Sequence, residues 1–415
     1  MNMPNVVLPL EFQWPDDVAN VPYWVYSSPE VYALEQERIF RGPTWNFVAL
    51  DAELAKPFDW KSTYIGDTPV IVTRDGDGNV HAWVNRCAHR GALICRELRG
   101  NNETHTCVYH QWAYDSAGNL IGVPFRRGIA GKGGYPEDFK MAEHNAQKLR
   151  ISQHKSLIFA TFSDDAPSLE EYLGQEMIRW IDRVFIEPVE FLGTARQFIS
   201  SNWKLYTENT KDPYHASLLH LFHATFGVYR SSMGGGATIG GMYGLHSCLN
   251  AWKIENEDIG EYKTGKVRTY DESVKLSDPS LLDVVPELDP VCTNHIQSIF
   301  PSMVLQQIHN TLAVRQILPK GPDKFELVFH FFGYVSDTPE LRAMRIKQAN
   351  LVGPAGFISM EDGEATELVQ KGIIGSENKY AYDALGGRTT QSTENLIDEA
   401  AIRALWQGYR RLMCF

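Results

Sequence analysis

The sequence lacks any long apolar run and any block of basic residues. Its 415 residues contain no window of about eighteen apolar side chains, so we expect no membrane-spanning helix. Lysine and arginine number 39 against 51 aspartates and glutamates, which gives a net charge of −12. This acidic surplus, without a basic cluster, argues against nucleic acid or an anionic membrane surface as a partner.

Cysteine is also scarce. The N-terminal stretch (MNMPNVVLPLEFQWPDD) has a short apolar run with no basic residue before it, so we expect neither a secretory signal nor a transit peptide. Scattered thiols in such a chain predict a cytoplasmic location rather than a disulfide framework. The six cysteines are Cys87, Cys95, Cys107, Cys248, Cys292 and Cys414.

The sequence also lacks a convincing Gly-rich dinucleotide-binding motif after a predicted strand. The run Gly234–Gly236 reads as a flexible loop. We therefore expect the oxidation of NAD(P)H to belong to another protein.

Short β-rich segments dominate up to about residue 160, with a hairpin turn expected at 75–79. Beyond that point helices and strands mix, which is an α+β pattern. Ser168 and Glu171 fit a capping box at the start of the clearest helix. Helices are predicted at 168–185, 203–226 (interrupted at Pro213), 338–351 and 395–413, and antiparallel strands within 296–335.

Two cysteine–histidine pairs lie close together in the β-rich part. They read Cys87-x-His89 and Cys107-x-x-His110, with seventeen residues between them, at expected hairpin tips. Zinc would accept these four ligands, but zinc sites usually space Cys with Cys and His with His. One thiolate and one imidazole per arm instead fit a [2Fe–2S] cluster with two Cys on one iron and two His on the other. Zinc binding and chance are the alternatives, and Cys95 is expected to be a buried small hydrophobic residue.

A second histidine pair follows in the segment ENTKDPYHASLLH. His215 and His220 are five residues apart, about 140° on a regular helix, whereas His223 would lie about 80° from His215. Pro213 makes irregular backbone credible, so two rings can converge on one ion, although core histidines are the alternative. With Asp362 they would form the two-His, one-carboxylate triad of non-heme iron, which leaves positions open for dioxygen. The acidic stretch around Asp362 could equally begin a solvated helix.

Three motifs in this order resemble the large (α) subunits of Rieske non-heme iron aromatic-ring-hydroxylating oxygenases. They are the two Cys/His arms, the Glu-Asn-x-x-Asp-x-Tyr-His-x-x-x-x-His segment and the later GPAGF…ED segment, and the likeness covers almost the whole chain. The resemblance implies an α+β chain with an N-terminal segment, 1–40, that packs on the catalytic domain. It further implies an all-β Rieske domain at 41–160 and a helix-grip-like catalytic domain at 161–415, in which helices and an antiparallel sheet hold mononuclear iron.

The resemblance also implies site residues. Asp212 takes the place of an aspartate that bridges the two metal centres, accepting hydrogen bonds from His215 and from His110 of a neighbouring subunit. A ring of subunits is implied because the two metals of one subunit lie too far apart for fast electron transfer. On its own, Asp212 reads as a turn residue. The implied ligands are Cys87, His89, Cys107 and His110 for the [2Fe–2S] cluster, and His215, His220 and Asp362 for Fe(II).

The implied activity is hydroxylation of an aromatic ring with dioxygen, most simply to a cis-dihydrodiol. Electrons are expected from a ferredoxin and/or an NAD(P)H-dependent reductase. The implied assembly is α₃β₃ with a small β subunit, or an α₃ homotrimer. Rival functions are a stand-alone Rieske electron carrier, a zinc-dependent structural protein, and a mono-oxygenase or demethylase of the same superfamily.

Arg315 points to the substrate class. It lies mid-strand among apolar neighbours, and a buried arginine usually needs an anion. The surrounding sequence resembles enzymes of the terephthalate dioxygenase and salicylate 5-hydroxylase type. This implies a monocyclic aromatic acid, and a monoacid such as an anthranilate, halobenzoate or salicylate, because no second arginine is obviously placed for a second carboxylate. The alternative is a structural arginine paired with a core acid, and Arg403, expected on a solvated helix face, is a weaker candidate. Further pocket candidates are Asn209, His223, His295, Gln307 and His309.

Overall fold

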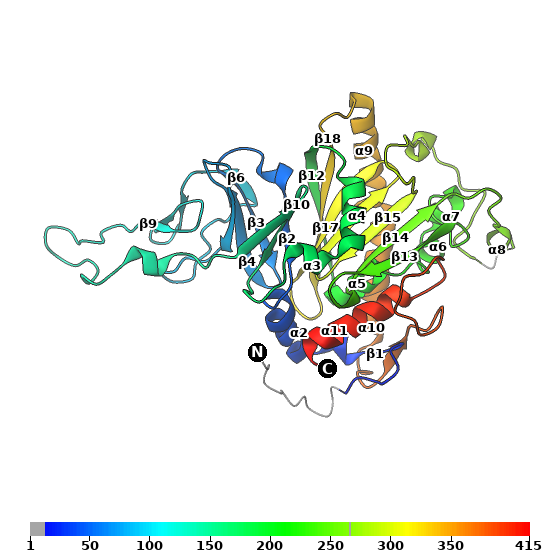
Figure 1. Ribbon diagram of the computed structural model, residues 1–415, viewed down its shortest axis with the longest axis horizontal. Coiled ribbons are helices and arrows are strands. Elements are labelled where there is room, and N and C mark those ends of the chain that lie inside the picture. Colours follow the sequence, from blue (N-terminus) through cyan, green and yellow to red (C-terminus); the bar gives the residue numbers. More distant parts are fainter. Residues whose placement is uncertain (1–12, 265–266) are drawn as a thin grey trace. The chain divides into compact units, whose positions relative to one another are not determined.

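The computed structural model describes residues 13–264 and 267–415 (Figure 1). Residues 1–12, which carry much of the prediction about a signal or transit peptide, lie outside the described residues. The chain divides into two compact units. The smaller unit is Phe40–Ala166, and the larger joins the described part of Met1–Ile39 to Pro167–Phe415. No helix formed by the described residues is long and apolar enough to cross a bilayer.

The smaller unit is built from three antiparallel sheets, with strand orders β5-β4-β3-β6, β10-β11-β2 and β7-β8-β9. The hairpin turn predicted at 75–79 is confirmed, because β4 pairs with β5 across it and the Asp75 carboxylate accepts the Asn79 N–H at 2.8 Å. The strands are β2 (Asn46–Leu50), β3 (Asp59–Ile65), β4 (Thr68–Arg74), β5 (Val80–Val84), β6 (Arg99–Asn101), β7 (His105–Thr106), β8 (Ala113–Tyr114), β9 (Leu120–Gly122), β10 (Arg150–His154) and β11 (Leu157–Thr161).

The larger unit contains a seven-stranded antiparallel sheet in the order β12-β18-β17-β16-β15-β14-β13. The strands expected within 296–335 are confirmed as its four consecutive central strands, and β1 pairs separately with β19. The strands are β1 (Asn20–Pro22), β12 (Val189–Ile199), β13 (Gly234–Gly240), β14 (His246–Trp252), β15 (Asn294–Ile299), β16 (Met303–Ile308), β17 (Thr311–Pro319), β18 (Phe325–Tyr334) and β19 (Tyr380–Tyr382).

Helices form in all four predicted regions, but the region 203–226 forms three short helices and the last helix begins at Ala400 rather than at 395. The Ser168–Glu171 capping box is present, but Gly174, at φ 75°, splits the first predicted helix into α3 and α4. The helices are α1 (Trp24–Ser27), α2 (Pro29–Glu35), α3 (Leu169–Leu173), α4 (Gln175–Val184), α5 (Trp203–Asn209), α6 (Ala216–Leu219), α7 (Leu221–Phe226), α8 (Gly260–Lys263), α9 (Pro339–Val352), α10 (Phe357–Gly372) and α11 (Ala400–Met413). Short 3₁₀ or π segments occupy Gln36–Phe40, Asp51–Leu54, Met141–His144, Met242–Gly244 and Pro279–Leu282.

The expectation of a flexible loop at Gly234–Gly236 is wrong, because these glycines open the edge strand β13. A Cβ atom at Gly236 would overlap the Thr393 carbonyl oxygen, and Ala237 pairs with Thr393 through two backbone hydrogen bonds of 3.0 and 2.9 Å. Glycine is required here because a distant part of the chain approaches the strand backbone closely.

The two faces of the large sheet carry different side chains. Alternation along β15 and β16 places Asn294, Ile296 and Ile308 on one face, and the residues between them on the other. The second face is covered by α4, whose Arg183 donates to Gln307 Oε1 at 3.1 Å. On the first face, α5 contacts β17 and α10 packs on α5. The space between that face and these helices contains the site described next.

Candidate metal centres

The two Cys/His loops of the smaller unit have the same backbone design. In each loop the cysteine N–H donates to the carbonyl five residues on, and the cysteine carbonyl accepts from the N–H four residues on. Both bonds measure 2.8 Å at Cys87 and 2.9 Å at Cys107. The residue four positions on has positive φ, 74° at Gly91 and 57° at Gln111. Two matching tight loops therefore present one cysteine and one histidine each.

Like donors face each other across these loops. The Nδ1 atoms of His89 and His110 lie 3.1 Å apart, and both Cys87 and Cys107 are buried. Burial raises the pKa of the Cys107 thiol, and the neighbouring Cys87 thiol raises it further. No three of these four residues, all within the described chain, bring their ligand atoms within 4.8 Å of one another. Such an arrangement fits a two-iron cluster with paired thiolates and paired imidazoles, and does not fit one tetrahedral zinc ion.

Aromatic side chains enclose this group. The Tyr114 hydroxyl donates to Cys87 Sγ at 3.4 Å, and Trp112 stacks on His89 with ring centroids 5.0 Å apart. Cys95 is buried outside the group, as predicted. The loops thus hold their cysteines in a low-polarity pocket while both histidines stay half-buried.

In the larger unit a broken helix brings His215 and His220 together. The helix α5 ends at Asn209, and α6 begins at Ala216, directly after His215. His220 separates α6 from α7, and its φ of −94° and ψ of 98° are not helical. The separation of about 140° expected on a regular helix does not apply across that break. Irregular backbone was predicted from Pro213, and the decisive irregularity is at His220 itself.

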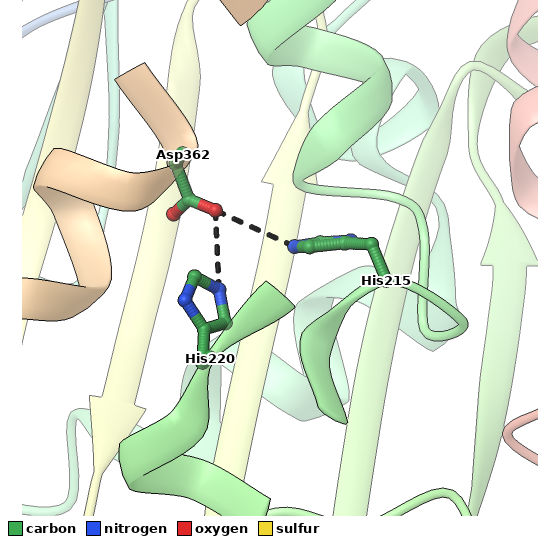
Figure 2. A group of neighbouring side chains, drawn as sticks. All are labelled: His215, His220 and Asp362. Carbon is green, nitrogen blue, oxygen red and sulfur yellow. Dashed lines mark ion pairs between the residues drawn. The ribbon is translucent and has the colours of Figure 1, made fainter. Parts of the chain in front are cut away.

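Asp362 completes the group (Figure 2). Its Oδ1 lies 3.2 Å from His220 Nε2 and 3.5 Å from His215 Nε2, and the ligand atoms of the three residues all lie within 4.8 Å of one another. Asp362 is buried in the middle of α10, so the alternative of a solvated helix start is wrong. Asn209 Nδ2 donates to Asp362 Oδ1 at 3.1 Å. His223 stays outside the group, although its ring lies 5.0 Å from that of His220.

Each of the two histidines has a carboxylate on its other nitrogen. Asp212 Oδ2 lies 3.3 Å from His215 Nδ1, and Glu361 Oε2 lies 2.7 Å from His220 Nδ1. The Glu361 hydrogen bond orients the His220 ring with Nε2 towards Asp362, and Asp212 lies within ion-pair distance of the His215 ring, whose Nε2 also faces Asp362. Glu361 was missed as a site residue, because only its position beside Asp362 in the sequence hinted at a role.

The electrostatics of this group suit a cation. Burial alone would raise the pKa of Asp362, but the charges and hydrogen bonds of His220 and His215 hold it well below its ordinary value. Burial opposes protonation of His215 too, yet Asp212 and Asp362 raise its pKa to about 10. A divalent ion bound at the same point would displace these imidazole protons and balance the same carboxylate. The residues present therefore fit a mononuclear metal ion of the iron type.

A cavity adjoins this group, and His215, His220 and Asp362 form part of its wall. Its walls are largely apolar, with Leu249, Ile296, Ile308 and Ile358 among them. The described lining contains a single Lys or Arg, Arg315.

The predicted pocket residues separate into two sets. Asn209, His223 and Arg315 line the cavity, whereas His295, Gln307 and His309 are not among its lining residues in the described chain. The reason is strand alternation, since His295 and Gln307 point to the α4 side of the sheet. There His295 Nδ1 bonds with Asn250 Oδ1 at 2.9 Å.

His309 and Arg403 lie away from the cavity for other reasons. His309 occupies the β16–β17 turn with φ 49°. The expectation of a solvated Arg403 is wrong, because Arg403 is fully buried and its guanidinium lies 3.2 Å from Asp398 Oδ1.

Sequence comparison gives matches along nearly the whole chain. A profile of the Rieske [2Fe-2S] domain matches residues 44–132, and one of the ring hydroxylating alpha subunit (catalytic domain) matches residues 137–413. The chain is 57% identical to the anthranilate 1,2-dioxygenase large subunit of Burkholderia cepacia, over 96% of this chain and 94% of that one. It is 44% identical to the terephthalate 1,2-dioxygenase terminal oxygenase component subunit alpha 2 of a Comamonas species, over 95% of each chain.

Structural comparison agrees. The naphthalene 1,2-dioxygenase of a Rhodococcus species, solved with indole bound, superposes with a TM-score of 0.79 at 22% identity and covers 95% of this chain and 94% of that one. This likeness shows a shared fold. The predicted α+β fold, with an all-β N-terminal part followed by an antiparallel sheet with helices, is confirmed.

We expect Cys107→Ser to remove the visible absorption of the cluster, because a serine hydroxyl does not replace a terminal thiolate ligand at neutral pH. Cys95→Ser is the matched control, since it changes a buried cysteine of the same unit outside the paired donors, and it should keep the colour. Absorption spectra with iron and sulfide analysis of the two variants provide the measurement. Full cluster content in Cys107→Ser would contradict the assignment.

We expect Glu361→Gln to weaken iron retention about tenfold or more, because an amide holds the His220 imidazole less firmly than a carboxylate. Glu364→Gln, on the exposed side of the same helix, is the control and should behave as wild type. The measurement is the iron left in the folded protein after dialysis against a graded chelator series. Equal retention in both variants would show that Glu361 has no part in holding the metal.

Proposed function

Because the chain belongs to the family of Rieske ring-hydroxylating oxygenase α subunits, we propose that it hydroxylates a monocyclic aromatic acid in the cavity beside its iron group. As a member of this family, it is a terminal oxygenase component that acts on aromatic rings and binds a Rieske [2Fe–2S] cluster and mononuclear Fe(II). When bound, the cluster passes electrons singly and the ferrous ion activates dioxygen.

The ligand assignment is part of the proposal. In the smaller unit the two histidines of the Cys/His loops face each other, which supports the cluster assignment. In the larger unit two imidazoles converge on one carboxylate, which supports the iron site. A stand-alone electron carrier would need only the first group, so the second favours the oxygenase. The proposed ligands are Cys87, His89, Cys107 and His110 for the cluster, and His215, His220 and Asp362 for the iron.

Arg315 is the observation that supports an acidic substrate. It is 4% exposed and lines the cavity, and its Nε and Nη1 donate to Gln306 Oε1 at 2.6 Å and to the Tyr206 hydroxyl at 2.8 Å. Among the described residues no Asp or Glu forms an ion pair with Arg315, so the structure does not support the alternative in which Arg315 is paired with a core acid. A buried guanidinium without an anion is unfavourable, and a substrate carboxylate would balance it with paired hydrogen bonds.

The relatives support the same class. The anthranilate, terephthalate and salicylate enzymes, at 57%, 44% and 38% identity, are all named for aromatic acids. With one cation in the described lining, the cavity suits one carboxylate better than two. We therefore propose an aromatic monoacid, with its ring between the apolar walls and its carboxylate on Arg315. Dihydroxylation is the proposed outcome, and mono-oxygenation or demethylation is the alternative.

Asp212 is proposed to connect two subunits of an α₃ or α₃β₃ ring, with its carboxylate between its own His215 and His110 of a partner subunit. Its Oδ1 caps the following turn by accepting the Tyr214 N–H at 2.8 Å, and its Oδ2 faces His215. Exposed apolar side chains flank both ends of this connection. Val108 and Tyr109, next to His110, are 59% and 58% exposed, and Tyr214 and Leu218 are 40% and 39% exposed beside His215.

The redox partners follow from the family. Its α subunits work in multicomponent systems with ferredoxin or reductase partners. We propose that NAD(P)H is oxidised by such a reductase and that the complex works in the cytoplasm, where that donor is available. A small β subunit is proposed as a further component.

We expect Arg315→Met to raise the KM for 2-aminobenzoate about tenfold or more, because a charge-assisted hydrogen bond contributes about 1.5–3 kcal/mol. Arg315→Lys should recover part of the loss. Arg196→Met, which removes an arginine from an ion pair on β12, is the control and should leave KM unchanged. An unchanged KM in Arg315→Met would remove the carboxylate anchor from the proposal.

We expect Asp212→Asn to keep both metals while slowing reoxidation of the reduced cluster about ten- to hundredfold in a single turnover. In asparagine the Oδ1 atom can keep the turn, but an NH₂ group replaces Oδ2 and cannot accept a hydrogen bond from an imidazole N–H. Asp258→Asn is the control, because Asp258 Oδ1 accepts the Gly260 N–H at 2.9 Å in a turn of the same kind. Stopped-flow absorption of the cluster provides the rate, and a wild-type rate in Asp212→Asn would exclude the bridging role.

A further inference from the structure

Two polar side chains in the cavity carry atoms that have no hydrogen-bond partner among the described residues. His223 is 3% exposed, and neither of its ring nitrogens has a partner in the described chain. Asn294 is 5% exposed, and its Oδ1 is likewise without a partner there. Both residues line the cavity. A buried polar group left without a hydrogen bond is costly, and native proteins rarely keep several in one place.

His223 does not serve as a metal ligand. It lies in the first turn of α7, three residues after His220, and its ring lies beside that of His220, yet its nitrogens are not part of the group that converges on Asp362. Its other aromatic neighbour is Tyr229, with ring centroids 6.2 Å apart, and the Tyr229 hydroxyl already donates to Pro213 at 2.7 Å. The hydrogen-bonding capacity of His223 is therefore left for a ligand in the cavity.

Asn294 is displaced from Arg315 along the sheet, and His223 belongs to α7, where the adjacent Phe222 packs in one cluster with Ile308, the strand partner of Asn294. Asn294 pairs with Ile308 of β16, while Arg315 pairs with Val304 of the same strand from the other side. The four-residue offset along β16 corresponds to about 13 Å of strand. A long arginine side chain can cover part of that span, so its guanidinium and Asn294 can contact different parts of one bound molecule.

We propose that His223 and Asn294 form a specificity subsite that hydrogen-bonds an amino or hydroxyl group on the aromatic ring of the substrate. This inference rests on the function proposed above and narrows it to acids with a second, uncharged polar substituent. A neutral imidazole and an amide can each donate and accept hydrogen bonds, which matches an amino or hydroxyl group. Hydrogen, halogen or alkyl substituents would leave both residues unsatisfied, and a second carboxylate would find no second cation in the described lining.

Equilibrium binding to the holoenzyme, measured calorimetrically without reductant, tests the subsite. The probes are benzoate and the 2-, 3- and 4-isomers of aminobenzoate and hydroxybenzoate. We expect at least one substituted acid to bind about tenfold tighter than benzoate in the wild type, because a site built to hydrogen-bond a group rejects the analogue without it. In His223→Phe and in Asn294→Leu that ratio should fall towards one.

Three further variants separate the possible causes. His223→Gln keeps a hydrogen-bonding group and should retain part of the preference even if His223→Phe folds poorly. His309→Phe changes a buried histidine that is not among the cavity-lining residues and should leave the ratio unchanged. Arg315→Met should weaken benzoate and the substituted acids equally, so loss of the carboxylate anchor is distinguishable from loss of the subsite.

Two results would overturn the inference. One is a wild type that binds benzoate as tightly as all six substituted acids. The other is a preference that persists unchanged in both His223→Phe and Asn294→Leu. Weaker binding of every acid in Arg315→Met, together with a ratio lost in the His223 and Asn294 variants, would support both proposals.

Discussion

The buried negative charge of Asp362 is the constraint on which the larger unit depends. A carboxylate that is 3% exposed must be balanced, and two imidazoles from a broken helix provide the positive side. Those imidazoles in turn need carboxylates behind them, which Asp212 and Glu361 supply. Carboxylates and imidazoles therefore alternate from Asp212 to Glu361, and a cation between the two imidazoles and Asp362 would balance the charge of this series. The cavity and its arginine are arranged around that centre.

Much of this could be predicted from the sequence, because ligand chemistry fixes residue types and spacing. The Cys/His arms were found by pattern, and the triad of His215, His220 and Asp362 by pattern together with the family resemblance; the structure places His89 beside His110 and brings the three triad residues together. On an ideal helix His223 would lie about 80° from His215 and His220 about 140° from it, so helical geometry alone would favour His223 as the second ligand. The backbone break at His220 decides between them, and no local signal in the sequence locates that break.

The cavity lining was harder to predict, because a strand turns consecutive side chains to opposite faces. His295 and Gln307 were chosen for their polar chemistry, but the lining comes from their neighbours Asn294, Ile296 and Ile308. An error of one residue moves a side chain across the sheet. Arg315 was placed correctly because its burial on an apolar strand is visible in the sequence. Glu361 escaped notice because a carboxylate beside another carboxylate looks like ordinary surface.

The alternation of side chains along β15 and β16 also means that substitutions on the two faces of these strands have different effects. Substitutions at Asn294, Ile296 or Ile308 change the shape and polarity seen by a ligand. Substitutions at His295 or Gln307 disturb the hydrogen bonds beneath α4 instead, and are expected to cost folding stability. A mutant library meant to change which compound is accepted should therefore randomise every second codon of these strands and keep the codons between them fixed.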